Sequence, residues 1–471
     1  MRTRIVAALL LAASIIFYFA GQRKNPPGFF MDESSIGWNA LQIARHGVDE
    51  NSVPFPLFFR AFGEYKNPTY IYLLAAVLKF TGPSNLAARR LSALLGWLAC
   101  VTIAWLGWRT SRSRFIAGAT LLTALFTPMI FEISRLAFEV ALYPLATALF
   151  LLCVYNASTR ERWRARDIAL ITASLLLLTY TYSIGRLFAP LMTASLFLFY
   201  TRERRSQLVT ITILFIALAI MPIAAYNAAR HGALTLRFHD LSYVNVRQPI
   251  VTIVGVEQHY IANLLPLGMA LRGDPNSRHH VANSGGSILL MTFVLAGIGA
   301  VIALRSRDRW WLFVLIGAAL SILPASLTND QYHTLRMAPY PLFLIALSIP
   351  ALEWLRTQRL ATATILAIGA IQAIWFITIF HRDGGKRVYE FDHGARRAVD
   401  TAIAQPARPI YVDPNLYIHA LWYGAQHGVE PSAFVFAIPT KPNAVVISGQ
   451  GTPPVATVLS DAEGWTVYVS R

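Results

Sequence analysis

Two adjacent carboxylates, Asp32 and Glu33, follow the first long apolar run of the chain at residues 5–20. Glu64 and Lys66 lie in the same segment, within a chain that is poor in acid, with 24 Asp+Glu against 41 Lys+Arg. A carboxylate can take a proton from a hydroxyl group, and a nearby cation can stabilise a phosphate leaving group. These residue types therefore suffice to transfer a group from a phosphate to a hydroxyl acceptor.

The acidic pair also has a simpler interpretation. A helix is expected to begin near Ser34, and carboxylates in the first turn of a helix stabilise its N-terminal end. Capping and catalysis do not exclude each other, so both interpretations stay open from these residues alone.

Other ionisable residues lie in turns between predicted apolar runs. Glu132, Arg135 and Glu139 occupy one turn, Arg186 a second and Arg336 a third. Charged groups at membrane depth are costly and are a first guide to function. The three arginines together would ring a cavity that suits an anionic lipid phosphate. Alternatively, each is a snorkelling side chain or part of an interfacial salt bridge.

Apolar segments must position these groups. The chain is 55% hydrophobic and has a mean hydropathy of +0.47, which is typical of polytopic membrane proteins. Crossing the hydrocarbon takes roughly 20 apolar residues. We predict an all-α membrane domain of about eleven transmembrane helices, at residues 4–21, 90–108, 115–132, 139–156, 167–184, 186–201, 207–227, 285–304, 309–327, 338–355 and 360–380.

Arginines gather in every second connection between these runs. Because short cytoplasmic loops accumulate Lys and Arg, the pattern predicts a cytoplasmic N-terminus and an external C-terminus. The predicted inner residues are Arg2, Arg4, Arg109, Arg112, Arg114, Arg160, Arg162, Arg164, Arg166, Arg202, Arg204, Arg205, Arg305, Arg307, Arg309, Arg356 and Arg359.

Three longer segments are external in this topology: residues 22–89, 228–284 and 381–471. The first contains apolar residues at helical spacing, which indicate amphipathic helices in the interface. A crossing by residues 68–82 would invert every later loop, so we exclude it. Residues 1–380 are predicted to form the transmembrane domain, with the first apolar run retained as a signal-anchor.

The last segment, residues 381–471, is predicted to be a small soluble α/β domain. Strands are expected near residues 408–412, 443–447 and 465–469, and helices at 393–404 and 415–427. No catalytic motif occurs in it, which favours a structural or acceptor-recognition role.

The formal charge of +17 does not indicate nucleic acid as a partner. Proteins that bind nucleic acid gather their charge on one water-facing surface, whereas these arginines are dispersed among short turns. Membrane lipids with anionic headgroups are the better explanation. Cys100 and Cys153 both lie in predicted membrane helices and form no disulfide framework.

The sequence predicts no definite cofactor or metal site. The second external segment contains His239, Asp240, His259, His279 and His280, but their spacing fits no compact metal site. A divalent cation held by Asp32, Glu33 or Glu139 is a second possibility that the sequence leaves open.

Six motifs together resemble a known family. They are Met31-Asp32-Glu33, Glu64-Tyr65-Lys66-Asn67-Pro68-Thr69-Tyr70, Ala88-Arg89-Arg90-Leu91-Ser92, Ser134-Arg135-Leu136-Ala137-Phe138-Glu139, Tyr180-Thr181-Tyr182 with Arg186, and His333-Thr334-Leu335-Arg336. Their order and topology resemble the glycosyltransferase C (GT-C) superfamily of polyprenyl-phosphate-sugar-dependent membrane glycosyltransferases. The branch is that of the protein O-mannosyltransferases and the lipid A aminoarabinose transferase.

The resemblance implies roles for individual residues. Asp32 matches the catalytic base in the first external loop, and Glu33 would support or orient it. Lys66 matches a lysine near the donor phosphate, and Arg186 and Arg336 are further phosphate contacts by position.

The resemblance also covers two further acidic residues, and the chain differs from the family's motif at one position. Glu139 matches a second acidic position facing the cavity, and Glu64 is expected to join it there. The chain has Asn67-Pro68 where two prolines are usual in the family, which weakens the match at Lys66.

The resemblance further implies an inverting transfer of a sugar from a polyprenyl-phosphate donor. The acceptor would be a hydroxyl group of lipid A or lipopolysaccharide, of a glycan or of a protein. The expected location is a bacterial inner membrane, with the active site facing the periplasm or exterior.

Two other functions compete with this expectation. An O-antigen ligase or polymerase also works outside on polyprenyl-linked donors, but would concentrate arginines and histidine in a large late loop. A transporter or flippase for lipid-linked sugars usually shows paired repeats, and we find no repeat in this sequence.

Overall fold

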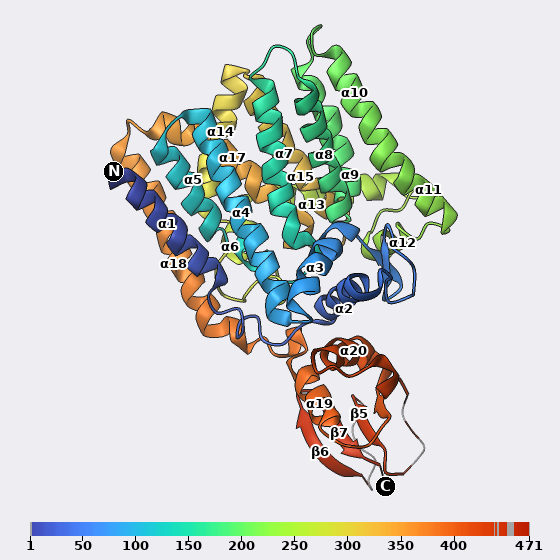
Figure 1. The fold of residues 1–471 in the computed structure, drawn as a ribbon. Helices are drawn as coiled ribbons and strands as arrows, with labels where there is room; N and C mark the ends of the chain where they lie inside the picture. The colour runs from blue at the N-terminus through green and yellow to red at the C-terminus, as the bar shows by residue number, and fades with distance from the viewer. Residues whose placement is uncertain (1, 438, 440–441, 450–455, 471) are drawn as a thin grey trace.

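The computed structural model describes residues 2–437, 439, 442–449 and 456–470, with side chains from Leu9 onward. Figure 1 shows a large helical bundle with a small sheet-containing unit below it. The bundle begins with α1 (Arg2–Phe19), α2 (Met31–His46), α3 (Pro68–Thr81), α4 (Asn85–Ser111), α5 (Arg114–Phe126), α6 (Pro128–Ile133), η1 (Glu139–Leu142), α7 (Tyr143–Ser158), α8 (Ala165–Thr181), α9 (Gly185–Ser195) and η2 (Leu196–Phe199).

The second half of the bundle also contains two short π-helical turns, η3 and η4. Its elements are α10 (Arg205–Phe215), η3 (Ile216–Ile220), α11 (Met221–Ala229), α12 (Leu236–Leu241), α13 (Pro249–Leu264), η4 (Gly268–Arg272), α14 (Leu290–Ser306), α15 (Arg309–Ser321), α16 (Leu323–Ser326), η5 (Thr334–Met337), α17 (Tyr340–Leu355) and α18 (Arg359–Asp383).

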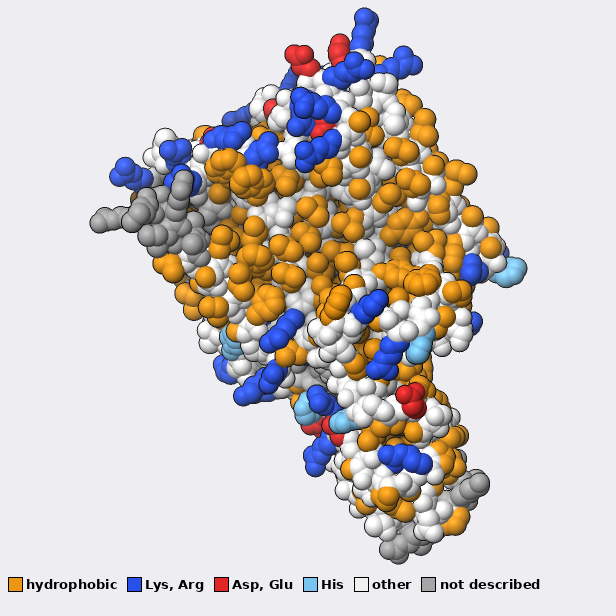
Figure 2. Space-filling view, viewed as in Figure 1, with side chains coloured by type: hydrophobic (Ala, Val, Ile, Leu, Met, Phe, Trp, Pro, Cys, Tyr) orange, Lys and Arg blue, Asp and Glu red, His pale blue; other side chains and the backbone are white. Residues whose placement is uncertain are grey.

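Helices occur at each of the apolar runs identified in the sequence. Within the described residues, five segments are long and apolar enough to cross a membrane: Asn85–Ser111, Glu139–Ser158, Arg205–Ala229, Arg309–Ser326 and Arg359–Lys386. Figure 2 shows a broad belt of hydrophobic side chains across the visible face of the bundle, with Lys and Arg gathered along its upper edge and again below it. This distribution suits a protein embedded in a membrane.

One predicted helix is divided by a proline. Residues 115–132 form α5 and α6, because Pro128 cannot continue a helix and restricts the residue before it. Thr127 accordingly adopts an extended conformation, with ψ of 113°. The break turns the chain so that α6 leads into the segment before Glu139.

The arginine-rich connections lie together at one end of the bundle. Arg204 donates to the carbonyl oxygens of Ser158 and Glu161 in the α7–α8 connection. Arg309, in the α14–α15 connection, donates to the carbonyl oxygen of Tyr200. Three of the arginine-rich connections, those before α8, α10 and α15, therefore meet at one end of the bundle. The side chains of Arg2 and Arg4 lie outside the described residues.

The other end of the bundle carries the first polar segment. A hairpin of β1 (Phe59–Ala61) and β2 (Glu64–Lys66) pairs Phe59 with Lys66 in antiparallel register. Its two-residue turn has φ of 53° at Phe62 and 77° at Gly63, the left-handed region that tight hairpins require. Lys66 is thereby held beside the start of α2.

The C-terminal unit contains a five-stranded sheet with the order β4-β3-β5-β7-β6. β3 pairs in parallel with β4 and β5, and β7 pairs antiparallel with β5 and β6. Its elements are η6 (Gly384–Lys386), η7 (Tyr389–Phe391), α19 (His393–Ile403), β3 (Ile410–Val412), η8 (Pro414–Leu416), α20 (Tyr417–Gln426), η9 (Pro431–Ala433), β4 (Phe434–Val435), β5 (Val445–Ser448), β6 (Thr457–Ala462) and β7 (Trp465–Val469). The three strands and two helices predicted from the sequence are present.

The C-terminal unit packs directly on α2 through α20 (Figure 1). Trp422 stacks on Phe29 at 5.8 Å between ring centroids and donates its indole N–H to Asn85. Gly37 faces the same indole ring, and a Cβ there would lie 3.0 Å from it. The close approach of α20 thus fixes the helix that begins beside Asp32.

Candidate functional site

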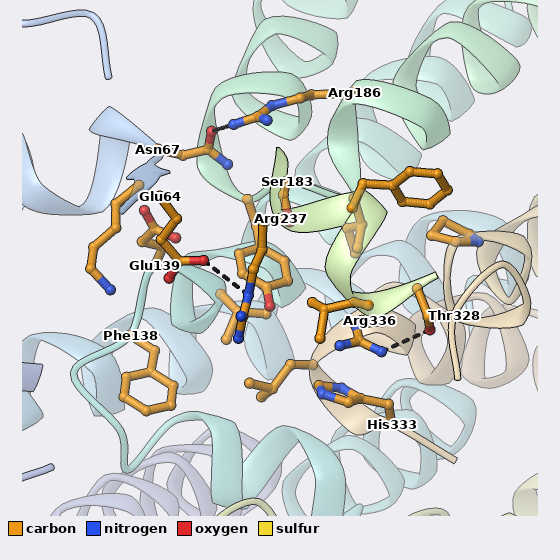
Figure 3. A pocket seen from close by; sticks show the side chains of 18 of the residues that line it. Glu64, Asn67, Phe138, Glu139, Ser183, Arg186, Arg237, Thr328, His333 and Arg336 are labelled. Atoms are coloured by element: carbon orange, nitrogen blue, oxygen red, sulfur yellow. Dashed lines mark hydrogen bonds and ion pairs between the residues drawn. The ribbon is translucent and has the colours of Figure 1, made fainter. Parts of the chain in front are cut away.

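A cavity of about 570 Å³ opens at the end of the bundle that carries α2 and the hairpin (Figure 3). The predicted residues Asp32, Glu64, Lys66, Glu139, Arg186 and Arg336 line it, whereas Glu33 and Arg135 do not. Its ionisable side chains are the carboxylates of Asp32, Glu64, Glu139 and Asp330, the cations of Lys66, Arg186, Arg237, Arg278 and Arg336, and the imidazoles of His279 and His333. Segments from distant parts of the chain therefore meet at one charged cavity.

Asp32 and Lys66 form an ion pair at the cavity wall. The Lys66 ammonium group donates to Oδ1 of Asp32 at 2.7 Å. The Lys66 side chain is 7% exposed and that of Asp32 33% exposed, so the carboxylate faces the cavity. Burial lowers the pKa of Lys66, but the negative charges of Asp32, Glu139 and Glu64 outweigh burial and raise it. Lys66 is thus a cation at neutral pH.

Glu33 lies in different surroundings from its neighbour. Its carboxylate is buried and accepts two hydrogen bonds from the guanidinium of Arg89, at 3.1 and 2.8 Å. It also accepts hydrogen bonds from the backbone N–H groups of Phe30 and Ala137. The bond to Phe30 caps the start of α2. Glu33 therefore ties α2 to α4 and to the segment before Glu139, and it does not reach the cavity.

Glu64 and Glu139 both contribute carboxylates to the cavity. Glu64 forms an ion pair with Arg237 of α12, with 3.1 Å between Oε2 and Nε. Oε1 of Glu139 is buried and has no hydrogen-bond partner among the described residues. The two acids therefore differ, because only Glu64 is neutralised by an ion pair.

Arg186 is held by neutral acceptors. It donates to the carbonyl oxygen of Leu234 at 2.7 Å and to Oδ1 of Asn67 at 2.9 Å. Asn67 stands at the position where the motif of the resembling family usually has a proline. Its side-chain oxygen accepts the hydrogen bond from Arg186. Because Asn67 directly follows Lys66, the two cations are brought to one side of the cavity.

Arg336 is held by an acid and a hydroxyl group. It donates to Oγ1 of Thr328 at 2.7 Å and to Oδ2 of Asp330 at 2.9 Å. Its charge is thus partly balanced before any ligand enters.

Arg135 does not join the other arginines, contrary to the sequence interpretation. Its guanidinium is buried over the ring of Phe131, 4.4 Å from the centroid, and donates to the carbonyl oxygens of Ala20 and Asn25. The turn after α6 directs this side chain toward the chain that follows α1. There it donates hydrogen bonds to backbone carbonyl oxygens that lie beyond the end of α1.

Arg237 and Arg278 line the cavity but were not identified from the sequence. The Arg278 guanidinium lies over the ring of Phe30, 3.5 Å from its centroid, and Nε donates to the carbonyl oxygen of Glu390. Burial lowers the pKa of Arg278, while the charges of Glu390 and Asp32 oppose that effect. Only the basic character of residues 228–284 could have pointed to these two arginines.

Three side chains with metal-binding atoms meet beside the cavity. Asp274, His279 and His333 each bring one such atom within 4.8 Å of the others. Of the residues considered from the sequence, His239, Asp240, His259, His279 and His280, only His279 belongs to this group. Spacing could not reveal the group, because His333 comes from another loop. Asp32 and Glu33, the alternative cation ligands, are paired with Lys66 and Arg89 instead.

Sequence comparison finds no family model and no curated protein that matches the chain. Comparison with solved structures does find similar proteins. ArnT from Cupriavidus metallidurans bound to undecaprenyl phosphate matches with a TM-score of 0.61 and 13% identity, over 98% of this chain and 97% of that chain. The chain has the GT-C fold.

A second GT-C neighbour is more distant. The archaeal oligosaccharyltransferase AglB from Archaeoglobus fulgidus, in complex with an inhibitory peptide and a dolichol-phosphate, matches with a TM-score of 0.50 and 12% identity. The match covers 92% of this chain and 64% of that chain. Both GT-C structures thus contain a polyprenyl phosphate. The fold that the sequence motifs implied is confirmed.

Proposed function

We propose that this protein is an inverting glycosyltransferase that moves a sugar from a polyprenyl-phosphate donor to a hydroxyl acceptor. The observation that carries the proposal is the 2.7 Å contact between Asp32 and Lys66 at the cavity. It places a proton acceptor and a buried cation side by side, the two groups that a transfer from a phosphate needs. The GT-C fold supports the same assignment.

The proposed reaction is a single displacement. Lys66 engages Oδ1 of Asp32, and Oδ2 takes the proton of the acceptor hydroxyl. The acceptor oxygen then bonds to the anomeric carbon as the bond from that carbon to the phosphate oxygen breaks. The electron pair leaves with the polyprenyl phosphate, which is a weak base and needs no general acid.

Lys66 and Arg186 are the principal contacts for the donor phosphate in this proposal. Asn67 links them, since it follows Lys66 and accepts from Arg186. Among the described residues, Arg186 donates its hydrogen bonds to neutral acceptors, so its charge is available to an anion. Arg336 contributes from the far side of the cavity, where it shares its charge with Asp330.

The two acids of the cavity have separate proposed roles. Glu139 lies near Lys66 with an unpartnered oxygen, which suits a hydroxyl group of the sugar. Glu64 positions Arg237. Glu33 acts through the position of Asp32, because its carboxylate fixes the first turn of α2.

We further propose that eleven helices cross a bacterial inner membrane, with the N-terminus in the cytoplasm and the cavity on the periplasmic or external face. The gathering of arginines at the end opposite the cavity supports this orientation. Residues 1–380 would form the transmembrane catalytic domain and residues 381–471 the external domain. The acceptor hydroxyl belongs to a lipid, a glycan or a protein.

The test is transfer by the purified protein in proteoliposomes. A polyprenyl-phosphate donor with a radiolabelled sugar is supplied with a panel of lipid, glycan and peptide acceptors. The proposal predicts label on an acceptor together with an equal amount of released polyprenyl phosphate. Movement of the intact donor across the bilayer without cleavage would instead identify a carrier.

A further inference from the structure

We propose that a second pocket, at the arginine-rich end of the bundle, binds the phosphate group of an anionic phospholipid. This pocket also has a volume of about 570 Å³. It lies where the α7–α8, η2–α10 and α14–α15 connections meet the end of α4. Its charged lining residues are Arg204, Arg309 and Asp308. Connections that are distant in the sequence therefore build one basic pocket.

The two arginines bring positive charges that are not neutralised by an ion pair. Every hydrogen bond that Arg204 and Arg309 donate within the described residues goes to a backbone carbonyl oxygen. Burial lowers the pKa of Arg204, and the positive charge of Arg309 lowers it further, against smaller opposing effects of Glu203 and Glu161. Two like charges thus lie close together, and an anion between them would relieve their repulsion.

The indole group of Trp310 adds a donor without a partner. Trp310 lines the pocket and is only 6% exposed. Its indole nitrogen forms no hydrogen bond with any described residue, and an unpaired buried donor is unfavourable. A phosphate oxygen in the pocket would pair this N–H group after a slight rotation of the ring.

The charge balance of the pocket suits a phosphate diester. Oδ1 of Asp308 accepts the backbone N–H groups of Trp310 and Trp311, at 2.9 and 3.2 Å, and so caps α15. Its negative charge offsets one of the two arginines, which leaves one positive charge uncompensated among the lining residues. The phosphate diester of a phospholipid carries one negative charge and would match it.

The surroundings of the pocket favour a lipid over a soluble anion. Tyr155, Trp310 and Trp311 line it, and Tyr and Trp are enriched where a protein meets the membrane surface. At the end of η2, Phe197 and Tyr200 are 46% and 47% exposed. Figure 2 shows Lys and Arg along the edge of the hydrophobic belt. A phospholipid with its phosphate in the pocket would lay its acyl chains on such an apolar surface, as basic pockets between membrane helices allow.

A lipid bound at this place would hold three connections together. Arg204 already joins the start of α10 to the α7–α8 connection, and Arg309 joins the start of α15 to the end of η2. One phosphate group contacted by both guanidinium groups would link these helices further, so the lipid should stabilise the bundle. This inference concerns the end opposite the candidate site, so it does not depend on the proposed reaction.

The test uses the purified full-length chain in a neutral detergent, after the native lipid has been removed. Phosphatidylglycerol, phosphatidylcholine or inorganic phosphate is titrated in, while bound lipid is counted by native mass spectrometry and the unfolding temperature is measured. We expect saturable binding of phosphatidylglycerol with a rise in unfolding temperature. Phosphatidylcholine, whose headgroup carries a compensating positive charge, should bind more weakly. Equal binding of the two lipids, or equal stabilisation by inorganic phosphate, would overturn the proposal.

Variants assign the tightest binding event to the pocket. Arg309→Gln should weaken phosphatidylglycerol binding at least about 10-fold, the loss expected for a charge-assisted hydrogen bond. Arg309→Lys keeps the charge without the planar guanidinium and should lose less. Arg309 is exposed and donates one hydrogen bond within the described residues, so both variants are expected to fold.

Arg305→Gln is the matched control. Arg305 is an exposed arginine in the last turn of α14, and it does not line the pocket. The control removes the same charge at the same end of the bundle and should bind phosphatidylglycerol as the wild type does. Equal affinity in wild type and Arg309→Gln, or an equal loss in Arg305→Gln and Arg309→Gln, would refute the assignment to this pocket.

Discussion

The Lys66 ammonium group contacts Asp32 directly, with 2.7 Å between Nζ and Oδ1. The contact joins β2 to the first turn of α2, so the geometry of the pair depends on both the hairpin and the helix. In the proposed reaction the Lys66 ammonium group keeps this contact with Oδ1 while it also approaches the donor phosphate, and Oδ2 is the oxygen that would take the proton of the acceptor.

Replacement of Lys66 should affect the donor more than the acceptor. Lys66→Ala removes the buried cation, and we expect the KM for the donor to rise at least about 10-fold while the KM for the acceptor changes little. Steady-state transfer kinetics with each substrate varied in turn measure this. Lys79→Ala, an exposed lysine on α3, is the control. A larger effect on acceptor KM would refute the phosphate role.

Replacement of Glu33 should reduce stability. Its carboxylate accepts two bonds from Arg89 and two from backbone N–H groups, and an amide cannot accept all four. Breaking a buried ion pair costs about 3–5 kcal/mol, so Glu33→Gln should unfold at a clearly lower temperature than wild type. Glu257→Gln, at an exposed position, should match wild type. An unchanged unfolding temperature of Glu33→Gln would contradict the positioning role.

Asn67 and Arg186 should act as a unit. Asn67→Ala removes the acceptor that holds the guanidinium, so we expect weaker donor use. Residues in one hydrogen-bond network typically show coupling energies of about 0.5–3 kcal/mol. The double variant Asn67→Ala/Arg186→Ala should therefore be no worse than Arg186→Ala alone. Fully additive losses in kcat/KM would show that the contact does not matter for the reaction.

Stability should depend on pH through Glu50. Burial raises the pKa of its carboxyl from 4.5 to about 7, opposed in part by Asn39 and Lys66, and Oε2 has no hydrogen-bond partner among the described residues. The protonated form is favoured in the folded state, so its stabilising contribution is present at low pH and is lost as the pH rises through about 7.

The measurement for Glu50 is the unfolding temperature between about pH 5 and pH 8. Stability should fall by up to about 1.4 kcal/mol per pH unit in wild type relative to Glu50→Gln. Glu430→Gln, at an exposed position, should retain the wild-type pH dependence. Parallel curves for wild type and Glu50→Gln would contradict the prediction.

The sequence predicted the large elements because their signals are local. Apolar runs marked the helices, and Val445, Val446 and Ile447 marked a strand whose residues are all buried. β6 was missed because most of its residues are exposed, and β4 because it contains only Phe434 and Val435. These short or exposed strands are defined by their partners in the sheet and not by their own composition.

The site was predictable only in part. Asp32 and Glu33 are adjacent in the sequence, but successive residues of a helix point about 100° apart. One therefore faces the cavity and the other faces Arg89. Whether Arg135 would turn toward the cavity depended on the path of the chain after α6, and the meeting of His333 with Asp274 depended on the packing of two loops. Contacts of this kind join segments that are distant in the sequence, so the spacing of residues does not predict them.

The most direct test of the proposed reaction is the transfer rate of Asp32→Asn in proteoliposomes, measured together with donor binding. Asp461→Asn, on the exposed face of β6, is the matched control. If Asp32 is the base, Asp32→Asn should lose about 10²–10⁴-fold in kcat while the folded variant still binds the donor, and the control should keep full activity. Wild-type transfer by a folded Asp32→Asn protein would contradict the assignment.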